Sequence, residues 1–223
     1  MSFISVKQVS KTYGAGEAAV AAIADMSLEI EAGEFVSIMG ESGAGKSTLL
    51  SVLGGMNTPT SGSYHVDGMD IYALHPEQRA DFRREYLGFI FQRFHLIPYL
   101  SVMENVQLPL VNTPKKAKEK TDMALQAIFW VGLEDKAESL ASLISGGEME
   151  RAAVARAIVN QPPILLADEP TGNLDSRNSN EVMQLLQQLN ADGATVIMVT
   201  HSAACAGYAH RRIEVRDGRV VAQ

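Results

Sequence analysis

Apolar and polar residues alternate in two segments near the start of the chain, residues 3–9 and residues 26–30. A period of two is the pattern of a strand with one buried face, so both segments are predicted to be half-buried strands of an antiparallel layer. A glycine-containing turn, residues 14–16, lies between them. Near the other end, residues 212–221 contain an Asp-Gly pair that predicts a β-hairpin.

Short continuous apolar runs occupy residues 34–39, 164–167 and 195–199. The first run stops at a glycine, and a helical pattern follows in residues 47–53, which gives the order strand, glycine-rich turn, helix. A further helical stretch around residues 180–189 separates the two later runs. Strands that alternate with helices predict a parallel sheet.

Between these two halves the strand signals disappear and helical patterns replace them. Thr113 followed by Pro114 is typical of a helix start, and Gly132 is typical of a helix end. We therefore predict a helical insertion over about residues 93–147. Trp130, near the end of this helix, is expected to pack locally.

The length of 223 residues suits one α/β domain with a large core, or at most two small domains. We predict a single domain over residues 1–223, with the core and the antiparallel layer in about residues 1–92 and 148–223 and the insertion as a helical subdomain. Hydrophobic residues make up 46% and charged residues 20%, which are values of a soluble globular protein and argue against disorder.

Charge and cysteine content narrow the class of protein further. The net charge of -7 disfavours a large nucleic-acid interface, so no nucleic-acid partner is expected. Cys205 is the single cysteine, so no intrachain disulfide forms and an oxidising compartment is not implied. No apolar run approaches the roughly 20 residues that span a bilayer, and the N-terminus is strand-like rather than a signal peptide. We expect no direct membrane insertion, so that another chain would supply any membrane part.

The sequence GESGAGKS at residues 40–47 matches the pattern G-x-x-x-x-G-K-[ST] of the Walker A loop. Glycines let successive backbone N–H groups converge on a phosphate, and the N-terminus of the following helix adds a positive end. Lys46 would supply a mobile positive charge and Ser47 a hydroxyl for Mg²⁺. The predicted phosphate-binding residues are Gly40, Glu41, Ser42, Gly43, Ala44, Gly45, Lys46, Ser47 and Thr48.

The apolar run at residues 164–167 ends in two carboxylates, Asp168 and Glu169, as a Walker B strand does. Such a strand end places both side chains at the edge of the sheet where open α/β folds bind ligands. Asp168 would orient Mg²⁺, and Glu169, held on a turn before Pro170, would accept a proton from an attacking water. Taken alone, the same residues would more simply be a strand followed by an acidic turn.

A second glycine-rich helix start lies at Ser145, Gly146 and Gly147, ahead of a helix predicted over residues 148–159. Its N-terminus can hold an anion. As an isolated feature it would more often be an ordinary cap, in which Ser145 accepts from the free N–H groups. Together with the first loop, however, one chain offers two places that suit a phosphate.

The motifs, and their order along the chain, resemble those of the ABC ATPases. The residues that carry the resemblance are the two Walker motifs, Ile144-Ser145-Gly146-Gly147-Glu148, Phe89-Ile90-Phe91-Gln92, Asn173-Leu174-Asp175 and His201. The resemblance implies a RecA-like P-loop α/β core with an antiparallel β subdomain and an inserted α-helical subdomain. It also implies hydrolysis of ATP with Mg²⁺.

The resemblance assigns further roles to single residues. It implies that Tyr13 stacks on adenine, that Gln92 senses Mg²⁺ and the membrane partner, and that His201 contacts the γ-phosphate. Asp175 would lie in the loop that crosses to a second subunit. Two subunits would then enclose two ATP molecules, each between the Walker A loop of one chain and the signature residues Ser145, Gly146, Gly147 and Glu148 of the other, and drive transmembrane permease subunits.

The stretches at residues 53–62, 91–98 and 171–175 resemble the branch of ABC ATPases that serve lipoprotein release (LolD), MacB-type export and the FtsE cell-division system. This branch implies a permease of the FtsX or MacB type and a peripheral position at the cytoplasmic face of the bacterial inner membrane. Three positions depart from the commonest pattern: Ile144 for Leu, Glu148 for Gln, and Ser202 for an acidic residue.

Other functions compatible with the motifs are an FtsE-like subunit that only transmits force, a soluble ABC ATPase acting on nucleic acid, and a small-molecule kinase. Nucleic-acid ABC ATPases usually carry tandem domains, coiled coils or basic tails, which this sequence lacks. A kinase would not need the signature residues or His201. The transported substrate stays open.

Overall fold

The computed structural model describes residues 2–222. At its centre the apolar runs pair into a six-stranded sheet in the order β10-β9-β3-β8-β7-β6, in which β3, β6, β7, β8 and β9 are parallel. β9 and β10 form the predicted hairpin, with both turn residues, Asp217 and Gly218, at positive φ. The strands are β3 (Phe35–Met39), β6 (Leu87–Phe91), β7 (Ile164–Asp168), β8 (Thr195–Thr200), β9 (Arg211–Arg216) and β10 (Arg219–Ala222).

A second sheet is antiparallel and has the order β2-β1-β4-β5, with β1 (Ile4–Tyr13), β2 (Val20–Ile30), β4 (Ser61–Val66) and β5 (Met69–Asp70). β1 continues past residue 9, where the alternation in the sequence stops. The alternation stops there because the pairing with β2 shifts register between Val6 and Val9 and again before Lys11. A β-bulge resets which side chains face inward, so a period-two pattern loses the strand there.

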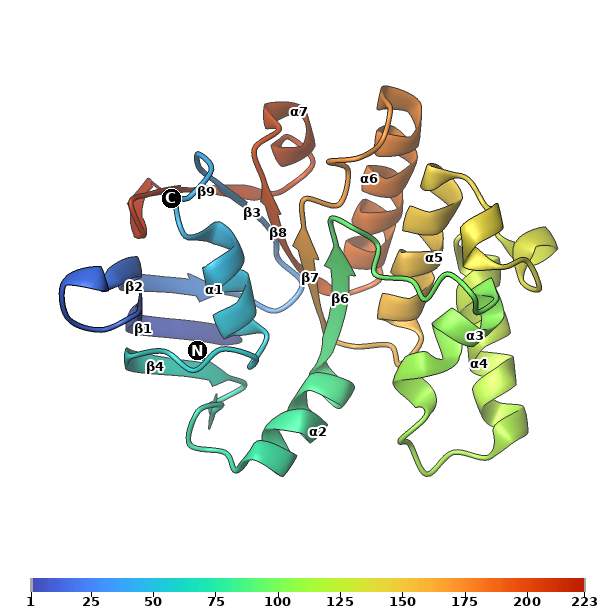
Figure 1. Ribbon diagram of the computed structural model, residues 1–223, viewed down its shortest axis with the longest axis horizontal. Helices are drawn as coiled ribbons and strands as arrows, with labels where there is room; N and C mark the ends of the chain where they lie inside the picture. The colour runs from blue at the N-terminus through green and yellow to red at the C-terminus, as the bar shows by residue number, and fades with distance from the viewer. Residues whose placement is uncertain (1, 223) are drawn as a thin grey trace.

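Helices cover both sides of the central sheet (Figure 1). They are α1 (Lys46–Leu53), α2 (Pro76–Tyr86), α3 (Val102–Gln107), α4 (Ala117–Trp130), α5 (Gly146–Ile158), α6 (Ser176–Ala191) and α7 (Ala203–Ala206), with short 3₁₀ turns at Gly16–Ala18, Leu108–Leu110, Glu134–Lys136 and Ala141–Leu143. The prediction of a helix start at Thr113-Pro114 was wrong. The Thr113 hydroxyl donates to Leu110 O and so closes the preceding turn, and α4 begins three residues after Pro114.

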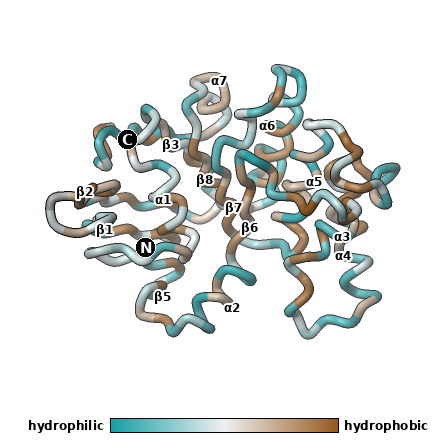
Figure 2. Tube along the Cα trace, viewed as in Figure 1, coloured by the Kyte–Doolittle hydropathy of each residue, from teal (hydrophilic) through white to brown (hydrophobic). Residues whose placement is uncertain are grey.

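Alternate residues of the central strands enter two different hydrophobic cores. In β7, Ile164 and Leu166 pack with α1 and the antiparallel sheet, whereas Leu165 and Ala167 pack with α3, α4, α5 and α6. A strand buried on both faces reads as a continuous apolar run, which is why the sequence pattern identified these strands. The hydropathy colouring in Figure 2 shows the central strands as the most continuous apolar region.

The register of the sheet brings the carboxyl ends of its strands to one edge. Met39 pairs with Thr200, Asp168 with Val199 and Phe91 with Asp168. Ligands of open α/β sheets bind outside this edge. Within residues 2–222, no helix has both the length and the apolar character needed to cross a membrane.

Candidate nucleotide site

The loop between β3 and α1 has the backbone that the glycine-rich sequence predicts. Gly43 and Gly45 adopt positive φ values of 82° and 95°, which only glycine tolerates freely. Gly45 is also the N-cap of α1, and no side chain caps this helix. The free N–H groups of its first turn are therefore available to an anion, and the helix dipole favours negative charge there.

Lys46 is held inside this loop. Its ammonium group donates to Gly40 O at 2.7 Å and to Glu41 O at 2.9 Å, and the side chain is only 8% exposed. Backbone carbonyls thus fix the charge within the curve of the loop. The loop therefore suits a polyphosphate, which needs a positive charge held among converging N–H groups.

Ser47 and Asp168 meet across the end of the sheet, where the Ser47 hydroxyl donates to Asp168 Oδ1 at 3.3 Å. Burial raises the pKa of Asp168, with the Glu169 carboxylate adding to the rise, while the Ser47 hydroxyl and Lys46 oppose it. A cation bound here would relieve the cost of the buried carboxylate. Hydroxyl and carboxylate oxygens are the hard donors that Mg²⁺ prefers, so the residues fit this ion.

Glu169 sits one residue beyond β7 with a positive φ of 48°, an unusual conformation for a non-glycine residue. Its Oε1 lies 2.8 Å from His201 Nδ1, and its Oε2 accepts from the Thr200 hydroxyl at 3.2 Å and from the His201 N–H at 3.3 Å. The carboxylate is therefore fixed against the end of β8. A strained backbone that aims a side chain in this way is typical of functional sites.

These side chains line one cleft of about 680 Å³ at the carboxyl edge of the sheet. The fold brings together eight predicted residues of the loop and the end of β7, together with the predicted residues Gln92 and His201. The cleft is lined by Ala22, Ser42, Gly43, Gly45, Lys46, Ser47, Thr48, Gln92, Asp168, Glu169 and His201. Gly40, Glu41 and Ala44 line an adjoining cavity of about 430 Å³ on the other side of the same loop.

Among the described residues, neither the cleft nor the adjoining cavity is lined by Tyr13, Asp175 or the signature residues. Tyr13 is 42% exposed at the end of β1, where its hydroxyl accepts from Asn57 Nδ2 and Lys11 Nζ lies 5.2 Å from its ring centre. Its adenine contact stays a prediction. Asp175 caps α6 by accepting from the Asn178 N–H at 2.9 Å and from Asn178 Nδ2 at 2.7 Å, which lowers its pKa.

The signature residues form the start of α5, on the far side of β6 and β7 from α1 in Figure 1. Ser145 and Glu148 make a capping box, in which the Ser145 N–H donates to Glu148 Oε2 at 2.7 Å and the Glu148 N–H donates to Ser145 Oγ at 3.3 Å. The Ser145 N–H and hydroxyl lower the pKa of Glu148, and Lys136 lies 3.8 Å away. Glu148 thus has a structural partner within its own chain.

Sequence reasoning missed contacts that arise only between segments. Thr200 holds Glu169, Asn173 Nδ2 donates to Gln92 O at 2.6 Å, and Ala22 of β2 closes one wall of the cleft. Their residue types carry no strong signal for these roles. Only the position of Thr200 at a strand end next to His201 could have pointed to it.

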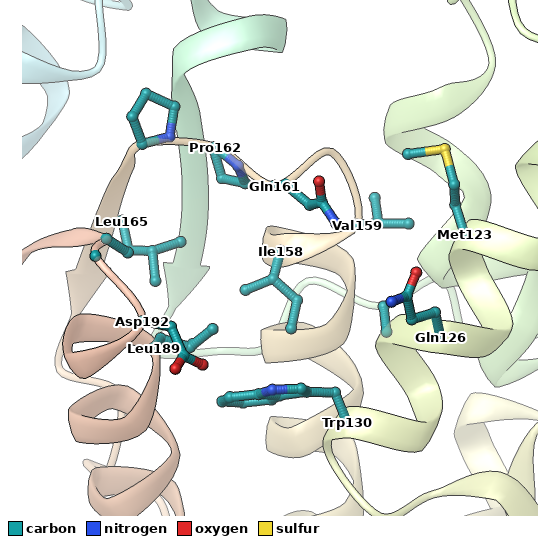
Figure 3. A pocket seen from close by; sticks show the side chains of 14 residues that line it. Met123, Gln126, Trp130, Ile158, Val159, Gln161, Pro162, Leu165, Leu189 and Asp192 are labelled. Carbon is teal, nitrogen blue, oxygen red and sulfur yellow. The ribbon is translucent and has the colours of Figure 1, made fainter.

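A separate apolar groove of about 480 Å³ lies between α4, the end of α5 and the end of α6. In Figure 3 the Trp130 indole forms its floor, with Ile158 above it and Leu189 and Asp192 beside it. Trp130 is half-buried against this core, as expected of local packing. The groove contains none of the predicted site residues, so the chemistry belongs to the other cleft.

A glycine-rich loop, a buried lysine and paired carboxylates at the carboxyl edge of a parallel sheet define a P-loop nucleotide-binding domain. The family model "ABC transporter" matches residues 23–172, which is more than half of the chain. The chain therefore belongs to the ABC transporter family, and it is an ABC ATPase.

Similar proteins include the macrolide export ATP-binding/permease protein MacB. The chain is 44% identical to MacB of Rhodopseudomonas palustris over 221 residues and 44% identical to MacB of Salmonella typhimurium over 220 residues. Each alignment covers 99% of this chain and 34% of the relative. The chain thus spans about a third of the length of these MacB proteins.

Solved ABC cassettes have the same fold. The dimeric ABC transporter cassette MJ0796 superposes with a TM-score of 0.91 at 42% identity. Its post-hydrolysis state bound to ADP and Pi superposes with a TM-score of 0.90. Each match covers 98% of this chain and 97% of the other chain. CbiO1 of Clostridium perfringens matches with a TM-score of 0.89 at 28% identity over 100% of this chain and 88% of its own. The predicted fold class and the ATPase activity are confirmed.

Proposed function

We propose that this chain is an ATP-hydrolysing subunit that dimerises on Mg·ATP and drives a transmembrane permease in lipoprotein release or MacB-type export. It would act peripherally at the cytoplasmic face of the bacterial inner membrane. The resemblance to MacB and to a dimeric cassette supports this proposal. The observation that carries it is the cleft, where Lys46, Asp168 and Glu169 converge.

Dimerisation is supported by the separation of two helix starts in one chain that both suit a phosphate. α1 begins at the cleft, whereas Ser145, Gly146 and Gly147 open α5 elsewhere on the molecule. Gly147 packs against the Asn178 amide so closely that a Cβ would overlap it, so only glycine fits at this helix start. A second copy would bring this helix start to the cleft of the first.

The residues of the cleft divide the chemistry among them. Residues 40–48 would bind the phosphates, and Ser47, Asp168 and Gln92 would hold Mg²⁺, which would supply charge neutralisation on the phosphate oxygens. Glu169, fixed by Thr200 and His201, accepts the proton of the attacking water. His201, which is well exposed beside it, contacts the γ-phosphate.

The permease would bind at a second groove of about 390 Å³ next to the Gln92 segment. Its walls combine apolar residues of β6 and of the helical insertion with arginines, among them Arg83, Arg84 and Arg156. Such a surface suits an amphipathic segment with acidic side chains.

Glu169→Gln tests the assignment of the base. Glutamine keeps the size and hydrogen-bonding capacity of Glu169 but not its basicity, so ATP should still bind while hydrolysis falls by a factor on the order of 10² to 10⁴. ATP hydrolysis and nucleotide affinity are measured together, with Glu85→Gln on the exposed face of α2 as the control. Size-exclusion chromatography with Mg·ATP should show a persistent dimer. Hydrolysis within a few-fold of the parent would move the base elsewhere, with His201 as the next candidate.

A further inference from the structure

The segment of residues 92–95, here called the Gln92 loop, is held through its backbone carbonyls by two side chains. Asn173 Nδ2 donates to Gln92 O at 2.6 Å. The two terminal nitrogens of Arg156 donate to His95 O at 2.5 Å and to Phe94 O at 2.7 Å. Three carbonyls of one short loop are thus fixed from outside it.

The conformation of the Gln92 loop needs such support. Phe94 and His95 have φ values of 56° and 51°, so two consecutive non-glycine residues are left-handed. A non-glycine residue in this conformation is less stable than one in ordinary backbone. The guanidinium fork of Arg156 binds the carbonyls of just these two residues, and its planar geometry suits paired acceptors.

The two supporting side chains come from different elements of the fold. Asn173 lies four residues after Glu169, and the same turn contacts the Gln92 side chain, since a Cβ on Gly172 would be only 3.1 Å from Gln92 Nε2. Arg156 belongs to α5, the helix that begins with the signature residues. One support therefore belongs to the turn after Glu169, and the other belongs to the helix that would face the second subunit under the proposed function.

We propose that Asn173 and Arg156 are positioning residues that hold the Gln92 loop so that the Gln92 amide reaches the metal ion. This inference rests on the proposed role of Gln92 as a metal ligand. It makes the affinity for the metal depend on two residues that do not touch it. Movement of either support releases the loop and weakens metal binding.

The test measures metal binding without turnover. All variants carry Glu169→Gln, ATP is present, and Mn²⁺ serves as the probe, with free Mn²⁺ quantified by electron paramagnetic resonance. Gln92→Ala, Asn173→Ala and Arg156→Lys should each weaken Mn²⁺ binding about three- to tenfold, the effect of losing one or two hydrogen bonds. Arg219→Lys, an exposed arginine of β10, should leave it unchanged.

Double variants separate positioning from general destabilisation. If Asn173 and Arg156 act through Gln92, adding Asn173→Ala or Arg156→Lys to Gln92→Ala should weaken Mn²⁺ binding no further. Fully additive losses of Mn²⁺ affinity would overturn the inference, because they would show that Asn173 and Arg156 affect metal binding independently of Gln92. Asn173 is exposed, so Asn173→Ala carries the test by itself if Arg156→Lys does not fold.

Two further outcomes are distinguishable. If Gln92→Ala weakens Mn²⁺ binding while Asn173→Ala and Arg156→Lys do not, the positioning inference is wrong and the metal role of Gln92 stands. If Gln92→Ala has no effect, the proposed metal role fails and the inference fails with it. Hydrogen exchange of the Gln92 loop should be faster in both positioning variants than in Arg219→Lys.

Discussion

Lys46 shows how one side chain is prepared for its ligand by the protein alone. Its ammonium group is bound by two carbonyls of its own loop and is almost fully buried. A polyphosphate would therefore meet a charge that is already placed, and less conformational entropy would be lost on binding.

Lys46→Ala removes this charge-assisted contact, which typically contributes about 1.5 to 3 kcal/mol, so ATP affinity should fall at least about tenfold. Titration calorimetry measures the affinity, with Lys118→Ala on the exposed side of α4 as the matched lysine control. Unchanged affinity in Lys46→Ala would remove the basis for assigning residues 40–47 to phosphate binding.

For single residues, the sequence predicts the role of those whose partners are near in the chain. The spacing of Gly40, Gly45 and Lys46 sets a loop by itself, so its residues were found without knowledge of the fold. The contacts of Thr200 with Glu169 and of Asn173 with Gln92 escaped prediction because the partners lie 31 and 81 residues apart in the chain. Such contacts depend on the register of the sheet, which the pattern of apolar residues does not specify.

Helix α5 carries two glutamates, two positions apart, with opposite electrostatic surroundings. The Ser145 N–H and hydroxyl at the N-terminus of the helix lower the pKa of Glu148. Burial raises the pKa of Glu150 to about 8, with the Arg156 guanidinium opposing the rise, and Glu150 Oε1 has no hydrogen-bond partner. The two carboxylates should therefore affect folding stability in different pH ranges.

Glu148→Gln should lower the stability of the folded chain at pH 7 by about 0.3 to 1 kcal/mol, the effect of a charge at an exposed helix N-terminus. Because its folded pKa is lowered, the contribution of Glu148 is present above the ordinary pKa of 4.5 and is lost as the pH falls through the lowered value. Urea unfolding at pH 7 and below pH 4 measures this, with the exposed Glu138→Gln as control. A difference that persists undiminished in acid would contradict the capping role.

Glu150→Gln should change the folding stability in the opposite direction and raise it. A raised folded pKa means that the folded chain binds the extra proton between pH 4.5 and about 8, so the parent loses stability as the pH rises through this window. The variant lacks this loss and should be more stable than the parent at pH 8, by an amount on the order of 1 kcal/mol, with little difference at pH 5. Thermal unfolding at both pH values checks it, and a variant that is less stable at pH 8 would refute the assignment.

Helices and strands were predictable from the sequence where a single local pattern determined them. The buried strands β3, β7 and β8 appeared as apolar runs within a residue of their ends. β1 was cut short at its bulge, and α4 was placed three residues early because Thr113 bonds to the turn before it. In both cases a local hydrogen bond or register shift overrode a pattern that was otherwise sound.

On the scale of the whole molecule, the sheet separates the two helix starts that suit a phosphate. The Walker loop and α1 lie with the antiparallel sheet, and α5 lies with the helical insertion. A sequence predicts that both exist, but not how far apart the sheet keeps them. Under the proposed function, this separation is the reason why a second copy would be needed to complete each site.

The most direct test of the shared site mixes two inactive chains. In Lys46→Ala the Walker loop is damaged, and in Ser145→Arg the signature helix start is blocked, so each chain alone should lose ATP hydrolysis. Thermal unfolding checks that Ser145→Arg still folds after losing its cap. An equimolar mixture should form heterodimers with one intact site each and recover about a quarter of the parent activity, since half of the dimers carry half of their sites. Full activity of either single variant, or no recovery in the mixture, would contradict the account.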